Sequence, residues 1–405
     1  YAEALKKGYT PETVVFDVPT EFSTECNPDG TPILPGNEDK CYKPEDYDGK
    51  YRGPMTLRDA LAQSVNVPAI QVLYLAGLKD SLRLAKDMGM TTLANTDRYG
   101  LTLVLGGGEV KLLDLTSAYG VFAAEGIRHS TTAILKVETA KGVLLEEKKD
   151  VAIPALDTEI SHVINDILSD NDARVPVFSP RSSLYFPDHK VAAKTGTTQD
   201  YRDAWTIGYT PSIAAGVWVG NNNNAAMNQK GLSVMVAGPI WHKFMQFALK
   251  NHPPEAFTPP APMEAAKPVF RGQYRNGQYT KIDKVSGKLA TVSTPPELTE
   301  EMSFGSATSI LSIINKNDPL GDTPPNLADS QYTNWQAGID QWLADHPFAI
   351  GQIAPPTAYD DLHTEARSPR ITWISPPDGV GAADARDEII VEIAAPLPLR
   401  EVSLF

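Results

Sequence analysis

Residues 189–220 contain the sequence feature that most constrains the fold. The segment Val191–Lys194 leads into a glycine, and strand-like runs follow at Ala204–Tyr209 and Ile213–Val219. Short β-rich runs separated by turn residues predict an antiparallel meander. Because a sheet must bury its apolar faces, the helical segments elsewhere in the chain are expected to cover it. The sequence therefore predicts a mixed α/β fold of the α+β type, with an antiparallel sheet flanked by helices.

The first strand of this meander carries Lys194-Thr195-Gly196-Thr197-Thr198. A lysine ammonium attracts a substrate carboxylate, and the hydroxyls of Thr195 and Thr197 can hydrogen-bond to that carboxylate. Gly196 removes a side chain that would block substrate from pairing with the strand edge. The backbone N–H of Thr197 is expected to face a developing oxyanion. We predict Lys194 as a catalytic residue and Thr195, Gly196, Thr197 and Thr198 as substrate-binding residues.

Ser64-Val65-Asn66 is a second candidate motif, at the end of a helix. Thr56-Leu57-Arg58-Asp59 approximates a capping box that opens this helix, and Pro68 suits the first turn of the next one. Ser64 can pass a proton between a lysine and a leaving amine. The amide of Asn66 can hydrogen-bond a substrate amide and a lysine. Ser64 and Asn66 are therefore predicted to converge with Lys194 in one cleft.

These motifs, in this order and about 130 residues apart, resemble the transpeptidase domain of class A penicillin-binding proteins. The similarity covers about residues 1–250. It is carried by Tyr51–Arg58, Ala62–Ala69, Tyr99–Leu101, Leu105–Val110, Lys194–Thr198, Asp203–Trp205 and Gly208–Pro211.

The resemblance implies a fold, a reaction and partners. The fold would be that of penicillin-binding proteins and β-lactamases. The substrate would be the D-Ala-D-Ala end of a peptidoglycan stem peptide, which an active-site serine attacks with loss of D-Ala. An amine of a neighbouring stem then takes the acyl group, and β-lactams trap the acyl-enzyme. No cofactor is expected.

The third signature of this family, S-x-x-K, carries the nucleophilic serine and does not occur in the chain. In the family, a helix resembling Tyr1–Leu5 follows that motif. We therefore expect the nucleophile just before Tyr1, with a glycosyltransferase domain and a membrane anchor further upstream. On this interpretation the 405-residue chain is inactive by itself, and the whole enzyme works at the extracytoplasmic face of a bacterial membrane.

Two other functions remain open at this stage. A serine β-lactamase shares the motifs, but it needs a base for deacylation, and no Glu-x-x-Leu-Asn segment lies between Asn66 and Lys194. A non-catalytic wall-binding module is the alternative from a different class, because the chain lacks its nucleophile.

Composition excludes some partners. The net charge of −14 argues against a nucleic-acid surface, because phosphate binding needs a basic stripe. No run approaches 18 apolar residues, so no membrane-spanning segment is predicted. Cys26 and Cys41 share one polar segment, and the sequence leaves both a disulfide and two free thiols open. No histidine lies near them, and no metal site is predicted.

The composition along the chain predicts four regions. Residues 1–252 would form the transpeptidase domain without its N-terminal part. Residues 253–268 contain six prolines and are predicted to be an extended linker. Residues 269–365 would form a small mixed accessory region. Residues 366–405 alternate as β-strands and resemble part of an immunoglobulin-like domain, which makes the C-terminal region β-rich.

Overall fold

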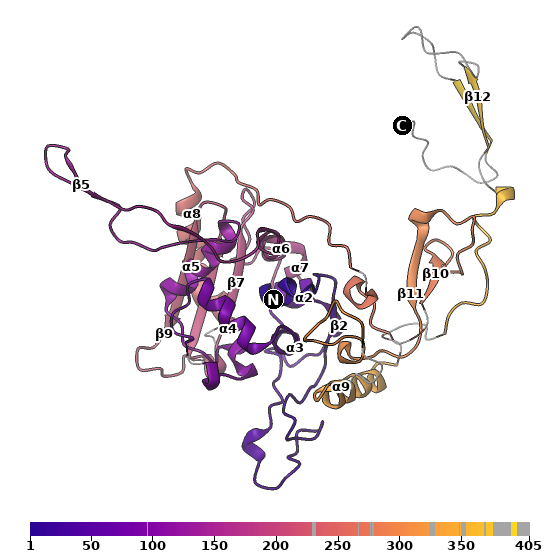
Figure 1. Cartoon of the computed structure of the whole chain (residues 1–405), viewed down its shortest axis with the longest axis horizontal. Helices are drawn as coiled ribbons and strands as arrows, with labels where there is room; N and C mark the ends of the chain where they lie inside the picture. Colours follow the sequence, from indigo (N-terminus) through magenta and orange to yellow (C-terminus); the bar gives the residue numbers. More distant parts are fainter. Residues whose placement is uncertain are drawn as a thin grey trace. The chain divides into compact units, whose positions relative to one another are not determined.

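The computed structural model describes residues 1–94, 96–228, 232–265, 267–275, 277, 279–323, 329–347, 349, 354–367, 370–375 and 390–394. The chain divides into two compact units (Figure 1). Unit 1 comprises Tyr1–Tyr274 and Thr308–Pro347, and unit 2 comprises Arg275–Ala307 and Phe348–Phe405. Helices and antiparallel sheets are mixed as expected, so the predicted fold class is confirmed.

Unit 1 contains helices and short antiparallel sheets. The helices are α1 (Ala2–Lys6), α2 (Leu57–Gln63), α3 (Asn66–Ala76), α4 (Leu78–Asp87), α5 (Leu112–Ala123), α6 (Thr158–Ser169), α7 (Asn171–Arg174), α8 (Ser233–Leu249) and α9 (Tyr332–Asp345). The strands are β1 (Val14–Asp17), β2 (Gly53–Thr56), β3 (Ile127–His129), β4 (Lys136–Glu138), β5 (Leu144–Glu147), β6 (Ala152–Pro154), β7 (Ala192–Thr197), β8 (Asp203–Tyr209) and β9 (Ala214–Gly220). The order β7-β8-β9 is the predicted meander.

The two faces of this meander pack into different cores. Successive side chains of a strand point to opposite faces. Accordingly, Ala192 joins a core with α5 and α6, whereas Ala193 joins a core with α8 (Figure 1). Trp241 of α8 is fully buried, and a Cβ at Gly208 would lie 2.3 Å from its ring. Glycine at position 208 therefore lets α8 approach the sheet closely.

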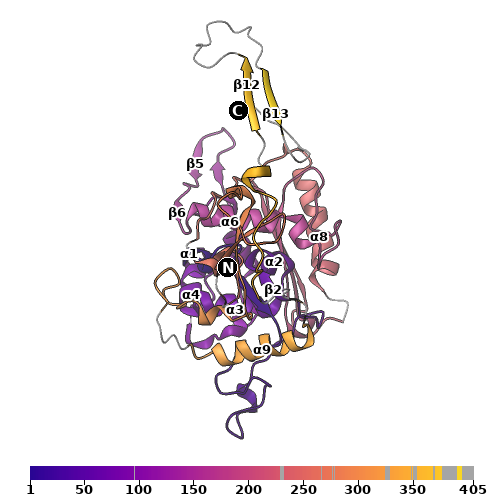
Figure 2. The same cartoon turned by 90° about the vertical axis from the view of Figure 1, so that its right-hand side faces the viewer.

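Helix α9 corrects the predicted boundaries of the accessory region. Its residue Trp335 is 2% exposed and belongs to the same hydrophobic core as Val72 and Leu75 of α3. The ring centroids of Trp335 and Tyr74 are 5.5 Å apart, and both views show α9 beside α3 (Figure 2). Residues 308–347 thus belong to unit 1. The large side chain of Trp335 is buried in the core of that unit and not in the core of a separate domain.

The proline-rich segment 253–268 also differs from the predicted extended linker. It belongs to unit 1, and Phe257 is buried with its ring centroid 5.7 Å from that of Tyr209. The backbone N–H of Ala261 donates to the carboxylate of Glu159 at 3.0 Å. The prolines favour an extended backbone, but the buried side chain of Phe257 attaches the segment to the core of unit 1.

Unit 2 contains β10 (Tyr279–Asp283), β11 (Thr299–Ser303), β12 (Arg370–Ser375) and β13 (Ile390–Ala394). Strand β10 pairs antiparallel with β11, and β12 pairs antiparallel with β13. The predicted immunoglobulin-like region 366–405 falls mostly outside the described residues. It therefore stays a prediction.

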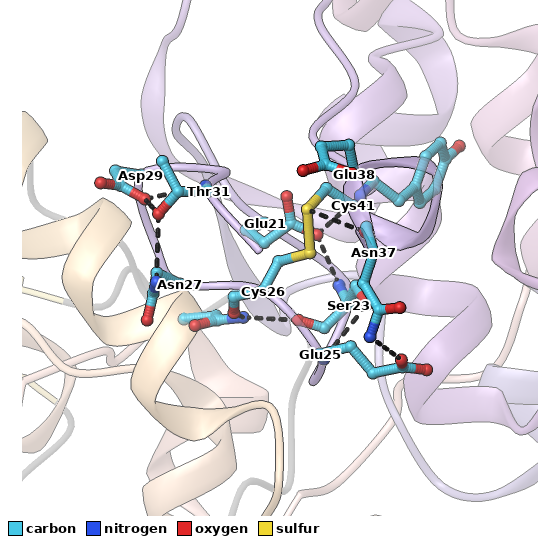
Figure 3. The surroundings of a disulfide bond; sticks show 12 residues. Glu21, Ser23, Glu25, Cys26, Asn27, Asp29, Thr31, Asn37, Glu38 and Cys41 are labelled. Atoms are coloured by element: carbon cyan, nitrogen blue, oxygen red, sulfur yellow. Dashed lines mark hydrogen bonds between the residues drawn. A yellow bond between two sulfur atoms is a disulfide. The ribbon is translucent and has the colours of Figure 1, made fainter. Parts of the chain in front are cut away.

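A long polar loop connects β1 to β2. Cys26 and Cys41 form a disulfide within it, with Cα atoms 5.6 Å apart (Figure 3). The side chain of Asn37 donates to the carboxylate of Glu25 at 3.3 Å beside the disulfide. Gln331, which precedes α9, donates to the carbonyl of Phe22 at 2.7 Å. A segment whose regular structure is limited to the short 3-10 helix Glu38–Lys40 is thus held by a cross-link and by side-chain hydrogen bonds.

Within the described ranges, none of the helices combines the length and the apolar character that crossing a bilayer requires.

Candidate active site

Ser64 lies at the break between α2 and α3. The predicted cap is present, because the Thr56 hydroxyl accepts from the backbone N–H of Asp59 at 3.1 Å. Helix α2 then ends at Gln63, and Ser64 adopts the left-handed conformation with φ 61° and ψ 43°. Few residues other than glycine adopt this conformation, and it costs of order 1–3 kcal/mol unless the surroundings hold it. The break turns the Ser64 side chain out of the helix.

Lys194 of β7 reaches this serine. Its Nζ donates to Ser64 Oγ at 2.5 Å and to the carbonyl oxygen of Thr195 at 2.8 Å. Burial, and to a lesser extent the positive charge of Arg174, together lower the pKa of Lys194 to about 8. Arg174 is itself buried in α7 and donates to the carbonyl oxygen of Leu168. A lysine whose pKa is close to neutral pH can both give and take a proton.

Asn66 is held by the polar loop rather than by Lys194. Its side-chain amide donates to the carbonyl oxygen of Glu45 at 3.0 Å. Its backbone N–H and that of Val67 donate to one carboxylate oxygen of Asp46, at 2.6 and 3.3 Å. Asp46 thereby satisfies two free N–H groups at the start of α3, where a negative charge is also favoured by the helix dipole. Among the described residues, a hydrogen bond joins Ser64 to Lys194 and none joins Asn66 to Lys194, so the convergence of all three in one cleft stays a prediction.

The edge of β7 away from β8 has no strand partner in the described part of the chain. The N–H of Thr198 donates to the carbonyl of Asp203, toward the β8 side. Hydrogen-bonding directions alternate along an antiparallel strand, so the N–H of Thr197 points to the open edge. A Cβ at Gly196 would meet only the Cβ of Trp205, at an ordinary 3.6 Å. The fold by itself therefore does not require glycine at position 196, and its lack of a side chain leaves the open edge accessible.

The hydroxyls of the two threonines after Gly196 already have protein partners. Thr197 Oγ1 lies 2.5 Å from Ser233 Oγ and accepts from the Ser233 N–H at 3.2 Å. Ser233 Oγ also donates to the carbonyl of Gly196. Thr198 Oγ1 donates to Asp203 at 2.9 Å. Ser233 begins α8, so these contacts attach the start of that helix to the strand.

The glycine run 106–108 lines the same region. Gly106 has φ +102°, and a Cβ there would lie 2.7 Å from Cγ2 of Thr198. A side chain would clash with the end of β7 as well as strain the backbone. Glycine at position 106 therefore allows a tight turn against the residue that follows β7.

Comparison with known proteins identifies the family. The family model described as "Penicillin binding protein transpeptidase domain" matches residues 29–246, more than half of the chain. The chain belongs to this family. It is 30% identical over 258 residues to penicillin-binding protein 1A of Neisseria lactamica, which covers 62% of this chain and 30% of that protein. It is 31% identical over 264 residues to penicillin-binding protein 1A of Aquifex aeolicus, with 64% and 33% covered.

Solved structures of penicillin-binding proteins share the fold. Penicillin-binding protein 1A from Haemophilus influenzae aligns with a TM-score of 0.54 at 21% identity, covering 76% of this chain and 47% of that one. PonA1 from Mycobacterium tuberculosis, solved in complex with penicillin V, aligns with a TM-score of 0.53 at 23% identity, covering 65% and 70%. The chain spans about 30% of the length of the curated relatives it matches.

Sequence reasoning missed three residues that contact or adjoin the predicted residues of this candidate site. They are Asp46, Arg174 and Ser233. Ser233 is a serine at the start of an apolar helix, a residue type that helix-start rules could have detected. Arg174 and Asp46 have no local signal, because they meet Lys194 and α3 only through the tertiary fold.

Proposed function

We propose that this chain carries the Ser-x-Asn and Lys-Thr-Gly part of a D,D-transpeptidase site that cross-links peptidoglycan stem peptides through an acyl-serine intermediate. The observation that carries the proposal is the 2.5 Å contact between Lys194 Nζ and Ser64 Oγ, beside an open strand edge. Proton relay needs hydrogen-bond reach of this kind. β-Lactams would acylate the nucleophilic serine of the S-x-x-K motif, and not Ser64, because they mimic the D-Ala-D-Ala end.

Each residue has a distinct proposed role. Lys194 and Ser64 pass a proton to the leaving D-Ala amine. The charge of Lys194 and the hydroxyls of Thr195 and Thr197 bind the terminal carboxylate. The Thr197 N–H donates to the oxyanion, and Asn66 binds a substrate amide once it exchanges its contact with Glu45. A donor fixed in advance at the oxyanion is typically worth 10²–10³-fold in rate.

The nucleophilic serine and its lysine are proposed to come from polypeptide outside these 405 residues. The absence of S-x-x-K from the sequence supports this, as does the greater length of the curated relatives. The whole protein is proposed to carry a glycosyltransferase domain and a membrane anchor, and to work on the extracytoplasmic side. The Cys26–Cys41 disulfide supports an oxidising compartment.

Covalent labelling with a fluorescent penicillin tests the proposal. We expect stable labelling of a longer protein that includes S-x-x-K, and no labelling of the 405-residue chain. A Ser64→Ala variant of the longer protein should label much more slowly, because the proton relay is broken. Labelling of the 405-residue chain would show that the nucleophile lies within it.

The same assay separates the alternatives. A β-lactamase-like hydrolase would release opened penicillin with repeated turnover instead of keeping the label. A wall-binding module would sediment with purified peptidoglycan, and the longer protein would remain unlabelled. Either result would overturn the transpeptidase proposal.

A further inference from the structure

Unit 2 contains a cluster of two buried aspartates, Asp283 and Asp360, and the partly buried His363. Each offers one ligand atom, and these atoms all lie within 4.8 Å of one another. His363 Nδ1 lies 2.8 Å from Asp360 Oδ2 and 3.5 Å from Asp283 Oδ1. The side chains of both aspartates are 0% exposed. The three residues come from the end of β10 and from a turn 77 positions later in the sequence.

Within the described ranges, one buried carboxylate oxygen of the cluster has no hydrogen-bond partner. Asp360 accepts from the Thr294 hydroxyl at 2.7 Å, from His363 Nδ1, and from two backbone N–H groups. Asp283 Oδ2 accepts from the Ser286 N–H at 2.7 Å. Asp283 Oδ1 is buried and has no hydrogen-bond partner within the described ranges. A buried acceptor without a donor costs about 1–3 kcal/mol or more when charged.

The charges of the cluster do not balance. Asp283 and Asp360 contribute two carboxyl groups to the cluster, and His363 contributes one imidazole. The nearby Lys288 pairs with Asp361 instead, at 2.7 Å. Two buried carboxylates therefore face one imidazole, and even a protonated His363 leaves one negative charge uncompensated.

We propose that Asp283, Asp360 and His363 bind a divalent metal ion, Zn²⁺ by the nature of the donors. Carboxylate oxygen and imidazole nitrogen both suit Zn²⁺, whereas Ca²⁺ and Mg²⁺ prefer oxygen ligands alone. Zn–ligand bonds of about 2.0–2.1 Å place neighbouring tetrahedral ligand atoms roughly 3.3 Å apart. The observed 2.8 and 3.5 Å from His363 Nδ1 to the two carboxylate oxygens bracket that separation, and all three ligand atoms lie within 4.8 Å of one another. The ion would displace the Nδ1 proton of His363, bind Asp283 Oδ1 and leave a fourth position for water.

The site would act as a structural cross-link. The buried hydrophobic side chains described in unit 2 are Ile282, Phe304 and Ala307. The turn containing Asp360 is joined to the segment between β10 and β11 by polar contacts. The carbonyl of Leu289 accepts from the Asp360 N–H at 2.7 Å, and Thr294 and Lys288 contact Asp360 and Asp361. Small cores of this kind are commonly reinforced by a metal or a disulfide. A bound ion would connect the two segments directly.

Metal binding can be measured on the whole 405-residue chain after treatment with a chelator. Titration calorimetry with ZnCl₂ should show one ion bound per chain, and the thermal midpoint should rise as zinc is added. Asp283→Asn keeps an oxygen for the Ser286 N–H but loses the carboxylate. It should weaken zinc binding by more than the roughly 10–100-fold that losing even an outer partner costs.

Asp361→Asn is the matched control, because Asp361 adjoins the cluster and pairs with Lys288 outside it. It should bind zinc like the unmodified chain. His363→Gln provides a second variant if Asp283→Asn does not fold, and it should lose zinc as well. Absence of zinc binding, equal affinity in Asp283→Asn, or tighter binding of Ca²⁺ than of Zn²⁺ would overturn the proposal.

Discussion

The two sides of the candidate active site are held in different ways. On one side, β7 pairs with β8 from Ala192 to Thr197, and its alternate residues are buried in two separate cores. On the other side, Ser64 and Asn66 lie at a break between helices, and the contacts of Asn66 come from the polar loop. Regular backbone pairing thus fixes the lysine side, whereas irregular long-range contacts fix the serine side.

This difference shows where the site is most easily disturbed. A strand within a ladder moves only with its neighbours, so a change on the Lys194 side should affect chemistry more than position. The loop depends on a disulfide and on contacts with the α9 region, including the bond from Gln331 to Phe22. Changes there should affect stability and position first. The following predictions test this contrast, from the largest expected effect to the smallest.

Lys194→Ala in the longer protein should slow acylation by penicillin by roughly 10²–10⁴-fold, the usual range for a lost acid–base group. The thermal midpoint should change little by comparison, because the β7–β8 ladder remains. Lys190→Ala, an exposed lysine just before the strand, is the control and should acylate normally. Rates within a few-fold of each other for the two variants would contradict the role of Lys194.

Replacing both Cys26 and Cys41 by Ser should lower the free energy of unfolding by about 3 kcal/mol, the entropy expected for a loop of this length. Urea unfolding of the chain, with and without reductant, measures this difference. Proteolysis should then begin in the polar loop while β7 stays protected. Unchanged stability would mean that the hydrogen bonds of the loop hold it without the disulfide.

Thr197→Ala should slow acylation about 10- to 150-fold, because it removes a neutral donor to a charged carboxylate worth roughly 1.5–3 kcal/mol. This is less than the effect of Lys194→Ala, since the Thr197 N–H remains. Ser233→Ala is the informative partner, because Ser233 holds the same hydroxyl in the empty site. If both variants lose the same activity, Thr197 acts by anchoring α8 instead of by binding substrate.

Acylation should fall about tenfold per pH unit above about 8 if Lys194 acts in its charged form. Because the pKa of Lys194 is lowered to about 8, raising the pH past 8 removes the proton from its ammonium group. The charged fraction of Lys194 then drops about tenfold for each further pH unit. Lys194→Arg keeps its charge throughout this range and should lack the decline. A rate that rises through pH 8 would indicate that neutral Lys194 acts as a base.

Asp46→Ala should cost about 0.5–2 kcal/mol of stability, as expected when the acceptor at a helix start is lost. It should also loosen Asn66 and slow acylation modestly, while Lys194 keeps its lowered pKa. Thermal unfolding and the acylation rate of the same variant measure the two effects. Asp48→Ala, two residues further along the loop, serves as the comparison; an equal loss of acylation in both would argue against a specific contact with α3.

Much of the site could be predicted because its signals are local. The K-T-G run precedes alternating apolar residues, and a period of two is sufficient to define a strand. The capping hydroxyl of Thr56 and the proline at position 68 mark the ends of the helices beside Ser64. These patterns describe elements of up to about twenty residues, within which backbone geometry and side-chain spacing follow directly from the sequence.

The domain boundaries could not be predicted in the same way. Prolines at 253–268 indicate an extended chain, but they do not show that Phe257 is buried against Tyr209. The burial of Trp335 against α3 likewise has no local signature, since the two segments lie more than 250 residues apart. Hydrophobic burial is non-directional, so a pattern shows that a face will be buried without showing what will cover it.

The sequence by itself determined the family, the strand that carries Lys194 and the helix break that presents Ser64. Only the tertiary structure decided that Arg174 lies close enough to lower the pKa of Lys194, that Asp46 holds the start of α3, and that Asp283 meets His363. Secondary structure depends on neighbours a few residues away. Electrostatic contacts depend on distances of a few ångströms between atoms that the chain brings together only when it folds.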